Sequence, residues 1–115
     1  LTHAKRLLQE RAAHMLNLKF MKSGVRETLA IIELAKQAQL PMQIGGMVES
    51  EVAMTASLHA VCSTSAIAFC DLDTPFFFAQ PIAVTSPYSA GSARLVLPQG
   101  AGLGLQVRDT YLSHS

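Results

Sequence analysis

The stretch that decides the fold runs from Met42 to Asp73 and reads MQIGGMVESEVAMTASLHAVCSTSAIAFCDLD. It opens on a short apolar run that ends in two glycines and continues through an alanine-rich segment. It closes on two carboxylates one residue apart, Asp71 and Asp73. The order predicts a strand, a helix and a second strand, and a crossover of this length favours parallel pairing of the two strands.

The same alternation extends toward the start of the chain. Apolar residues recur at three- and four-residue steps over residues 3–14, which predicts an amphipathic helix. Pro41 ends a second helical pattern, because proline cannot continue the hydrogen-bond ladder. Further elements are predicted in this order: strand 15–20, helix 26–39, strand 42–47, helix 51–63 and strand 66–70. We expect an α/β fold in which helices cover parallel strands.

The chain changes character after Pro75. Residues 94–97 could pair as a strand, and residues 99–105 form a glycine-rich turn. This turn lacks the following helix that would direct its dipole at a phosphate, so a dinucleotide site is not expected.

Composition excludes several classes of protein. The 115 residues are half hydrophobic and carry a formal net charge of +1, with basic residues scattered along the chain. We expect no nucleic-acid partner, and no apolar run approaches the roughly 18–20 residues of a membrane span. A cytoplasmic protein is expected, with Cys62 and Cys70 reduced and buried and with His59 packed on its helix.

Two sets of charged residues are candidates for a site. Lys19 lies in the apolar run 16–20, where an ammonium group is costly without a task. It could also extend from a strand end to solvent, and Lys22 is the competing lysine, expected to be solvated. Asp71 and Asp73 would face the same side of a strand and suit a cation, unless one of them caps the next turn.

Three spaced motifs together resemble a known family. They are Lys19, the run Gly45-Gly46-Met47-Val48-Glu49-Ser50 and the run Asp71-Leu72-Asp73-Thr74-Pro75. The chain resembles the C-terminal third of the mandelate racemase and muconate-lactonizing branch of the enolase superfamily. Within that branch it most resembles the dipeptide epimerases of the L-Ala-D/L-Glu type.

This resemblance implies a specific fold. It predicts that residues 1–81 are the last three βα units of a (β/α)8 TIM barrel. Residues 82–115 would then return to a capping domain built from the two chain ends. The chain begins with Leu1, and we expect it to be the back part of a longer protein.

The resemblance also implies a chemistry, the Mg²⁺-dependent removal of a proton beside a carboxylate through an enediolate. Lys19 would be one acid/base residue, and Asp71 and Asp73 would bind the α-ammonium of a dipeptide substrate. Gly46 would lie against the substrate, and Glu49 would orient its neighbours, the lysine among them. The family's metal ligands and second lysine belong to other strands, so no residue of this chain is assigned to the metal.

Other functions remain open. Muconate cycloisomerases, o-succinylbenzoate synthases and sugar-acid dehydratases share the superfamily, and a non-catalytic remnant of the fold is also possible. The aspartate pair argues against the first three, because their substrates carry no ammonium at that place. We expect the chain alone to be inactive and to bind no Mg²⁺ tightly. We also expect it to be stable only with the missing part or as a homo-oligomer.

Overall fold

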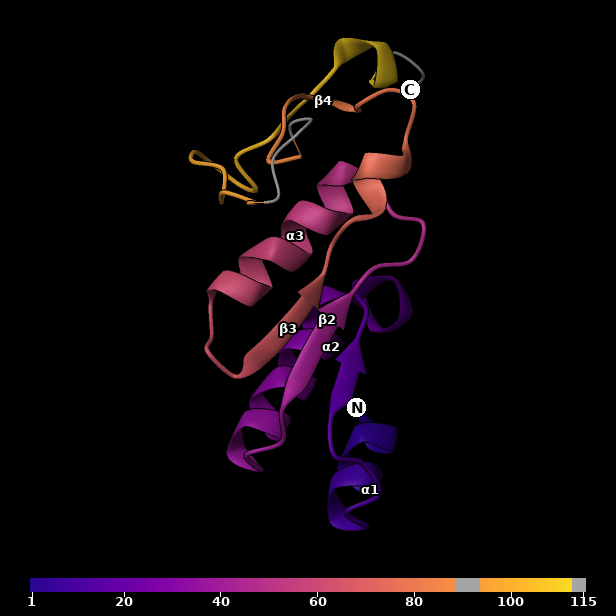
Figure 1. Ribbon diagram of the computed structural model, residues 1–115, viewed down its shortest axis with the longest axis vertical. Coiled ribbons are helices and arrows are strands. Elements are labelled where there is room, and N and C mark those ends of the chain that lie inside the picture. The colour runs from indigo at the N-terminus through magenta and orange to yellow at the C-terminus, as the bar shows by residue number, and fades with distance from the viewer. Residues whose placement is uncertain (89–93, 113–115) are drawn as a thin grey trace.

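Three parallel strands form the central sheet, with a long helix behind it (Figure 1). The computed structural model describes residues 1–88 and 94–112. The elements in chain order are α1 (Thr2–Gln9), β1 (Leu16–Leu18), α2 (Phe20–Gln37), β2 (Met42–Gly45), α3 (Glu51–Cys62), β3 (Ile67–Asp71), η1 (Thr74–Phe77), β4 (Ala83–Thr85), β5 (Gln106–Val107) and η2 (Asp109–Tyr111). The strand order β1-β2-β3 with parallel pairing confirms the predicted α/β fold.

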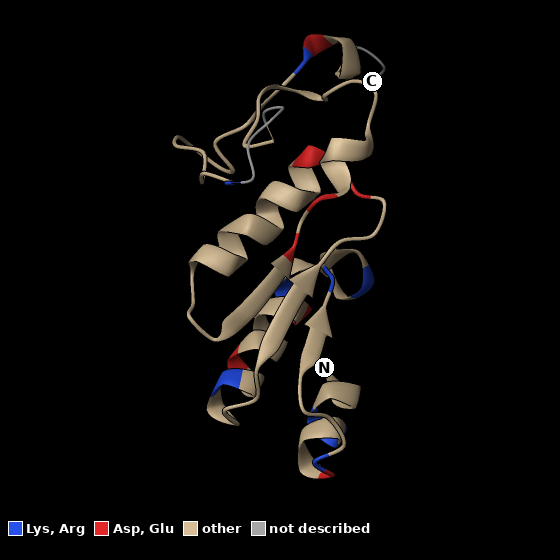
Figure 2. Ribbon diagram, viewed as in Figure 1, with Lys and Arg blue, Asp and Glu red and all other residues tan. Residues whose placement is uncertain are grey.

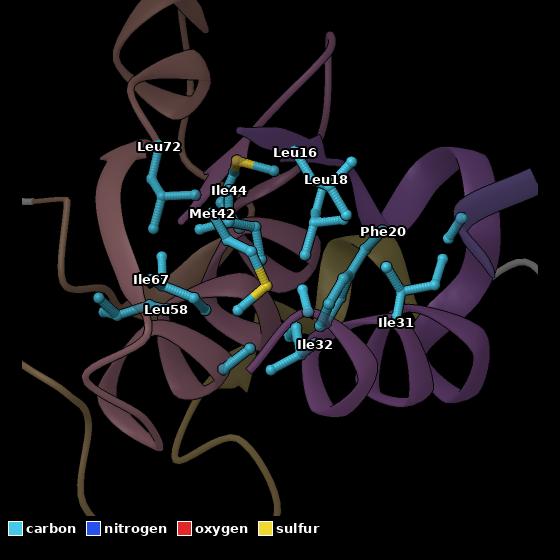
Figure 3. Packing of buried hydrophobic residues seen from close by; sticks show 14 of the residues in the cluster. Leu16, Leu18, Phe20, Ile31, Ile32, Met42, Ile44, Leu58, Ile67 and Leu72 are labelled. Carbon is cyan, nitrogen blue, oxygen red and sulfur yellow. The ribbon is translucent and has the colours of Figure 1, made fainter. Parts of the chain in front are cut away.

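One side of the sheet, here called the outer face, is buried. It consists of Leu16, Leu18, Met42, Ile44 and Ile67. These side chains pack against the helices, where Phe20 and Ile32 of α2 and Leu58 of α3 complete the cluster (Figure 3). Full burial of such a side chain stabilises a fold by about 1.5–3 kcal/mol. The outer face therefore holds the strands and helices together.

The opposite side, here called the inner face, is polar and open. It consists of Asn17, Lys19, Gln43, Gly45, Phe69 and Asp71. The pairing of β2 with β3 shifts register between Met42 and Gln43, which places Phe69 and Asp71 on this face although Ile67 lies on the other. Phe69 is 59% exposed, so the inner face is accessible in this chain.

Helix boundaries differ from the predicted ones near the start of the chain. The predicted helix over residues 3–14 is too long, because α1 ends at Gln9 and Arg11 takes a left-handed conformation with φ 50°. The second helix begins earlier than predicted, since Phe20 already starts α2. Gly24, with φ 72° and ψ 165°, interrupts α2 after its first turn, in a backbone conformation that favours glycine.

The tail is attached to the rest of the chain by a buried carboxylate. Glu51, in the first turn of α3, accepts hydrogen bonds through Oε2 from the backbone N–H groups of Ile82 (2.7 Å) and Ala83 (3.0 Å). Strand β4 pairs antiparallel with β5, and the backbone N–H of Arg108 donates to the Ile82 carbonyl at 3.0 Å. The tail therefore packs at the end of the sheet toward which the strands point (Figure 1).

The predicted strand over residues 94–97 is wrong, because this segment forms no strand. Leu95 and Leu97 pack partly buried against the core, while Val96 between them is 64% exposed. Alternating hydrophobicity here reflects the packing of two leucines on the core and not pairing with a strand. The glycine-rich segment 99–105 is a turn as predicted, and three of its glycines have positive φ.

The cysteines are also placed differently from expectation. Cys62 and Cys70 are both free thiols, but both are exposed, so the predicted burial is wrong. Cys62 ends α3, and Cys70 lies on an edge strand. His59 is packed as predicted, with Nε2 at 3.2 Å from the Leu103 carbonyl oxygen. Within residues 1–88 and 94–112, no helix is both long and apolar enough to span a membrane.

Candidate active site

The carboxyl ends of the three strands bring the predicted charged residues to one edge of the sheet. Lys19 follows β1 directly, and its Nζ donates a hydrogen bond to the carbonyl oxygen of Gly46. The Gly46 N–H donates in turn to the backbone carbonyl of Asp71 at 3.0 Å. Figure 2 shows a basic residue at the end of β1 and acidic residues at and beyond the end of β3. The predicted lysine and the first predicted aspartate therefore share one site.

Gly45 leaves the space into which these side chains point. A Cβ atom added at Gly45 would lie 3.2 Å from Lys19 Nζ, 3.4 Å from Asn17 Oδ1 and 3.9 Å from Asp71 Cβ. Lys19 and Asp71 thus converge on the same point of the inner face. The sequence prediction placed Gly46, and not Gly45, against the substrate, although strand alternation puts residue 45 level with Asp71 and on the same face.

Gly46 faces the opposite way. A Cβ atom there would lie 2.7 Å from Thr74 Oγ1 and 3.0 Å from Met54 Sδ, and Met54 is completely buried. The room at Gly46 is therefore taken by packing and not by the inner face, which corrects the reason expected for this glycine. Its link to the site is its backbone, through the carbonyl that accepts from Lys19.

The two aspartates differ in backbone setting. Asp71 is the last residue of β3, whereas Asp73 lies beyond the strand with φ −87° and ψ −13° at the start of η1. Strand alternation therefore does not extend to Asp73, and the predicted alignment of the pair by alternation is wrong. Both side chains are exposed, while Leu72 between them is buried. The Asp73 side chain makes no capping hydrogen bond, so capping does not occupy its carboxylate.

The loop after β2 is fixed by two side chains. Glu49 Oε1 accepts from the Met47 N–H at 3.0 Å, and Thr74 Oγ1 donates to the Met47 carbonyl at 2.6 Å. Glu49 is only 5% exposed, whereas Met47 is 45% exposed and therefore not part of the core. Lys22 is exposed, as predicted for a solvated lysine.

The part of the chain that the structure describes does not form a metal site by itself. In residues 1–88 and 94–112, no group of three His, Cys, Asp or Glu residues could hold a metal ion. Asp71 and Asp73 are only two oxygen-bearing side chains, and hard cations take six or more oxygen ligands.

Similar proteins extend this description. Residues 1–111 match the family described as Enolase C-terminal domain-like. The D-Ala-D/L-Ala epimerase of Cytophaga hutchinsonii is 39% identical over 96% of this chain and 30% of its own length. The aromatic dipeptide epimerase of Herpetosiphon aurantiacus is 39% identical over 87% of this chain and 28% of its own length. The chain thus spans about 30% of the length of these relatives.

Solved structures agree with the sequence relatives. The dipeptide epimerase of Cytophaga hutchinsonii, complexed with Mg and the dipeptide D-Ala-L-Val, superposes with a TM-score of 0.84 at 37% identity, over 96% of this chain and 30% of that one. A muconate cycloisomerase variant superposes with a TM-score of 0.83 at 27% identity, over 96% of this chain and 31% of that one. The three parallel strands, the strand-end lysine and the extent of the match lead to one conclusion: this chain belongs to the Enolase C-terminal domain-like family.

Proposed function

We propose that this chain supplies one acid/base residue and the ammonium-binding carboxylates of a dipeptide epimerase. The observation that supports this most directly is the convergence of Lys19 Nζ and Asp71 above Gly45. The inner face there is open, so a small molecule can reach both groups. Relatives named as dipeptide epimerases match nearly the whole chain, in agreement with the proposal.

Each residue has a defined part in the proposed reaction. The amine of Lys19 removes the α-proton beside the substrate carboxylate from one face of the carbon. A C–H bond breaks, an N–H bond forms, and the electron pair of the C–H bond moves into the adjacent carboxylate to give an enediolate. In the reverse direction its ammonium returns the proton to that face. Asp71 and Asp73 accept hydrogen bonds from the substrate ammonium, which has three donors and a full charge. An acid/base group on the opposite face would have to come from elsewhere in the enzyme.

The fold alone does not separate dipeptide epimerases from cycloisomerases, because a muconate cycloisomerase superposes as well as an epimerase does. The two exposed carboxylates favour the epimerase. A carboxylate pair beside the site would repel a dianionic substrate and attract an ammonium group. The proposed substrate is therefore a short peptide with a free amino terminus.

The test uses a chimeric enzyme in which this chain replaces the matching region of the Cytophaga hutchinsonii D-Ala-D/L-Ala epimerase. We expect the chimera to exchange the α-proton of D-Ala-D-Ala and D-Ala-L-Ala with D₂O, measured by proton NMR. Lys19→Ala should lower exchange from one of the two epimers by about 10²–10⁴-fold, the usual contribution of general acid/base catalysis. The exposed Lys22→Ala is the matched control and should change exchange less than twofold.

Two further results decide between the candidates. Asp71→Asn should raise KM for dipeptides about tenfold or more, because a charge-assisted hydrogen bond contributes about 1.5–3 kcal/mol. N-acetylated dipeptides, which lack the ammonium, should be poor substrates of the unmodified chimera. Exchange that persists in Lys19→Ala for both epimers would rule out the proposed role of this lysine. A preference for acylated substrates would favour another enolase-type reaction.

A further inference from the structure

Glu49 is a buried carboxylate, and none of the ion pairs recorded for the described residues includes it. Its side chain is 5% exposed, and its recorded hydrogen bond is the one that Oε1 accepts from the Met47 N–H at 3.0 Å. Among the described residues, it forms no ion pair with Lys19. Burying a carboxylate is costly unless its hydrogen bonds compensate, so its position calls for an explanation.

The explanation lies in the peptide unit that joins Gly46 to Met47. The Gly46 carbonyl and the Met47 N–H belong to one planar peptide and point in opposite directions. Glu49 accepts from the N–H end, and Lys19 Nζ donates to the carbonyl end. A carboxylate on the N–H end fixes the plane and also polarises the carbonyl toward the ammonium, because hydrogen bonds in a chain strengthen one another.

A second contact holds the next peptide unit. Thr74 is buried, and its Oγ1 donates to the Met47 carbonyl at 2.6 Å. Thr74 directly follows Asp73, so this bond ties the loop after β2 to the aspartate turn. The loop is thus held on one side by Glu49 and on the other by Thr74.

We propose that Glu49 is a positioning residue that holds the Lys19 ammonium in the site through the Gly46–Met47 peptide. Its effect on turnover rests on the proposed function of Lys19, whereas its effect on the location of the ammonium does not. Glu49 does not transfer a proton in this proposal, because it contacts the site through the backbone alone.

The chain contains a matched control for this proposal. Glu51 is equally buried, at 4% exposed, and also accepts hydrogen bonds from backbone N–H groups. Its partners, Ile82 and Ala83, lie in the tail and have no recorded contact with Lys19. Replacement of Glu51 should therefore weaken the attachment of the tail without changing the environment of the lysine.

The first experiment measures the reactivity of Lys19 toward acetic anhydride, with Lys22 of the same molecule as reference. Acetylation at each lysine is quantified by mass spectrometry, in the 115-residue chain and in the chimera. Glu49→Ala should raise the Lys19 to Lys22 ratio about threefold to tenfold, the effect of losing about one hydrogen bond. Glu49→Gln keeps an acceptor oxygen and should restore a ratio within twofold of the unmodified protein.

Two results of this experiment would overturn the proposal. One is an unchanged ratio in Glu49→Ala, and the other is an equal rise in Glu51→Ala, which would indicate general loosening. Circular dichroism of each variant shows whether it is folded. Thr74→Val serves as a second variant on the same loop and should raise the ratio, whereas Thr74→Ser, which keeps the hydroxyl, should not.

The second experiment measures turnover in the chimera. Glu49→Ala should lower kcat for exchange from the epimer that depends on Lys19, by about tenfold, and leave KM within about twofold. Glu49→Gln should recover most of this loss. An inactive unmodified chimera would overturn the proposed function, while the acetylation ratio would still decide the positioning role of Glu49.

Discussion

The two faces of the sheet differ in nearly every respect although they share three strands. The outer face is apolar and buried, with Met42 and Ile44 fully inaccessible to solvent. The inner face combines a lysine, an aspartate and a glycine, and it is open enough to leave Phe69 59% exposed. Successive residues of a strand alternate between these environments. The residues that stabilise the fold and those of the proposed site therefore occupy alternate positions of the same short segments.

This separation has a practical consequence for mutagenesis. A substitution on the outer face should change the free energy of unfolding, and one on the inner face should change binding or turnover. Neighbouring residues provide matched pairs, because they share a strand and differ only in the face that they occupy. The loop after β2 is the place where the two faces meet, since Gly46 packs on one side and presents its carbonyl to Lys19 on the other.

The largest expected difference is between Ile44→Ala and Gln43→Ala. Ile44 is fully buried, so its truncation should lower the free energy of unfolding by about 2–5 kcal/mol. Gln43, next to it on the inner face, should change stability by about 0.5 kcal/mol or less. Urea denaturation followed by circular dichroism measures both values. Equal losses would show that the inner face also contributes to the core of this chain.

Gly45 and Gly46 are adjacent but face opposite sides of the sheet, so alanine at each position should affect stability differently. Gly46→Ala should destabilise the fold by about 1–3 kcal/mol, because its Cβ would overlap Thr74 Oγ1 and crowd Met54 Sδ. Gly45→Ala should leave stability within about 0.5 kcal/mol, since its φ is not positive and the atom nearest to its Cβ is the flexible end of the Lys19 side chain, which can move.

The same two substitutions should differ in the opposite sense in their effect on catalysis. Relative to the stability that each one loses, Gly45→Ala should lower the exchange rate more than Gly46→Ala. In the chimera, Gly45→Ala should lower exchange about tenfold or more, because a Cβ 3.2 Å from Lys19 Nζ displaces the ammonium. Exchange rates from NMR and unfolding energies from urea denaturation are measured on the same preparations. A stable Gly46→Ala combined with an unstable Gly45→Ala would contradict the assignment of the two faces.

Much of this arrangement could be predicted from local patterns. Alternating and three- to four-residue hydrophobic periodicities located the three strands and the helices between them, because those periodicities report which side of each element is buried. Lys19 and Asp71 could be singled out because parallel strands bring their carboxyl ends to one edge. These features depend on neighbours in the sequence, and so a single sequence is sufficient for them.

Other features depend on contacts between distant residues. The prediction that Gly46, and not Gly45, lies against the substrate could not be checked from the sequence. It requires knowing that Thr74 and Met54 fill the space next to Gly46. Residues 94–97 carry a strand pattern, yet their leucines are buried by packing on the core and not by a partner strand. Asp73 departs from strand alternation because the short helix η1 begins at the next residue. Pro75 is compatible with the start of a helix, but the proline alone does not fix the residue at which the strand ends.

The exposed inner face should also affect the association of the chain with copies of itself. An exposed phenylalanine beside open strand edges favours contacts between copies of the chain. Phe69→Gln should therefore shift the isolated chain toward monomer, by about 1–2 kcal/mol per subunit contact, the scale of burying one aromatic side chain. Analytical ultracentrifugation over a concentration series measures the shift. The matched control is Val48→Gln in the loop after β2, where the side chain is 78% exposed, and it should leave association unchanged.

The smallest expected effect concerns Tyr88, which extends the outer-face core from the tail. Its ring packs edge-to-face on Phe76 at 5.5 Å between centroids, and within the described residues its buried hydroxyl has no hydrogen-bond partner. Burial, with smaller contributions from Cys70 and Glu51, raises the pKa of Tyr88. Tyr88→Phe removes an unpaired polar group and keeps the ring, so stability at pH 7 should be unchanged or rise by about 1 kcal/mol.

The free energy of unfolding should depend on pH in a different way with and without the Tyr88 hydroxyl. Because the pKa of Tyr88 is higher in the folded than in the unfolded chain, the folded state retains the phenol proton more tightly. The associated stability is fully present below about pH 10, the ordinary pKa of tyrosine, and is lost as the pH rises above it. The unfolding energy of the unmodified chain should therefore fall more steeply between pH 9 and pH 11 than that of Tyr88→Phe, as measured by urea denaturation. Tyr111→Phe, at an exposed tyrosine, should follow the unmodified chain, and parallel curves for all three proteins would show that the Tyr88 hydroxyl is hydrated.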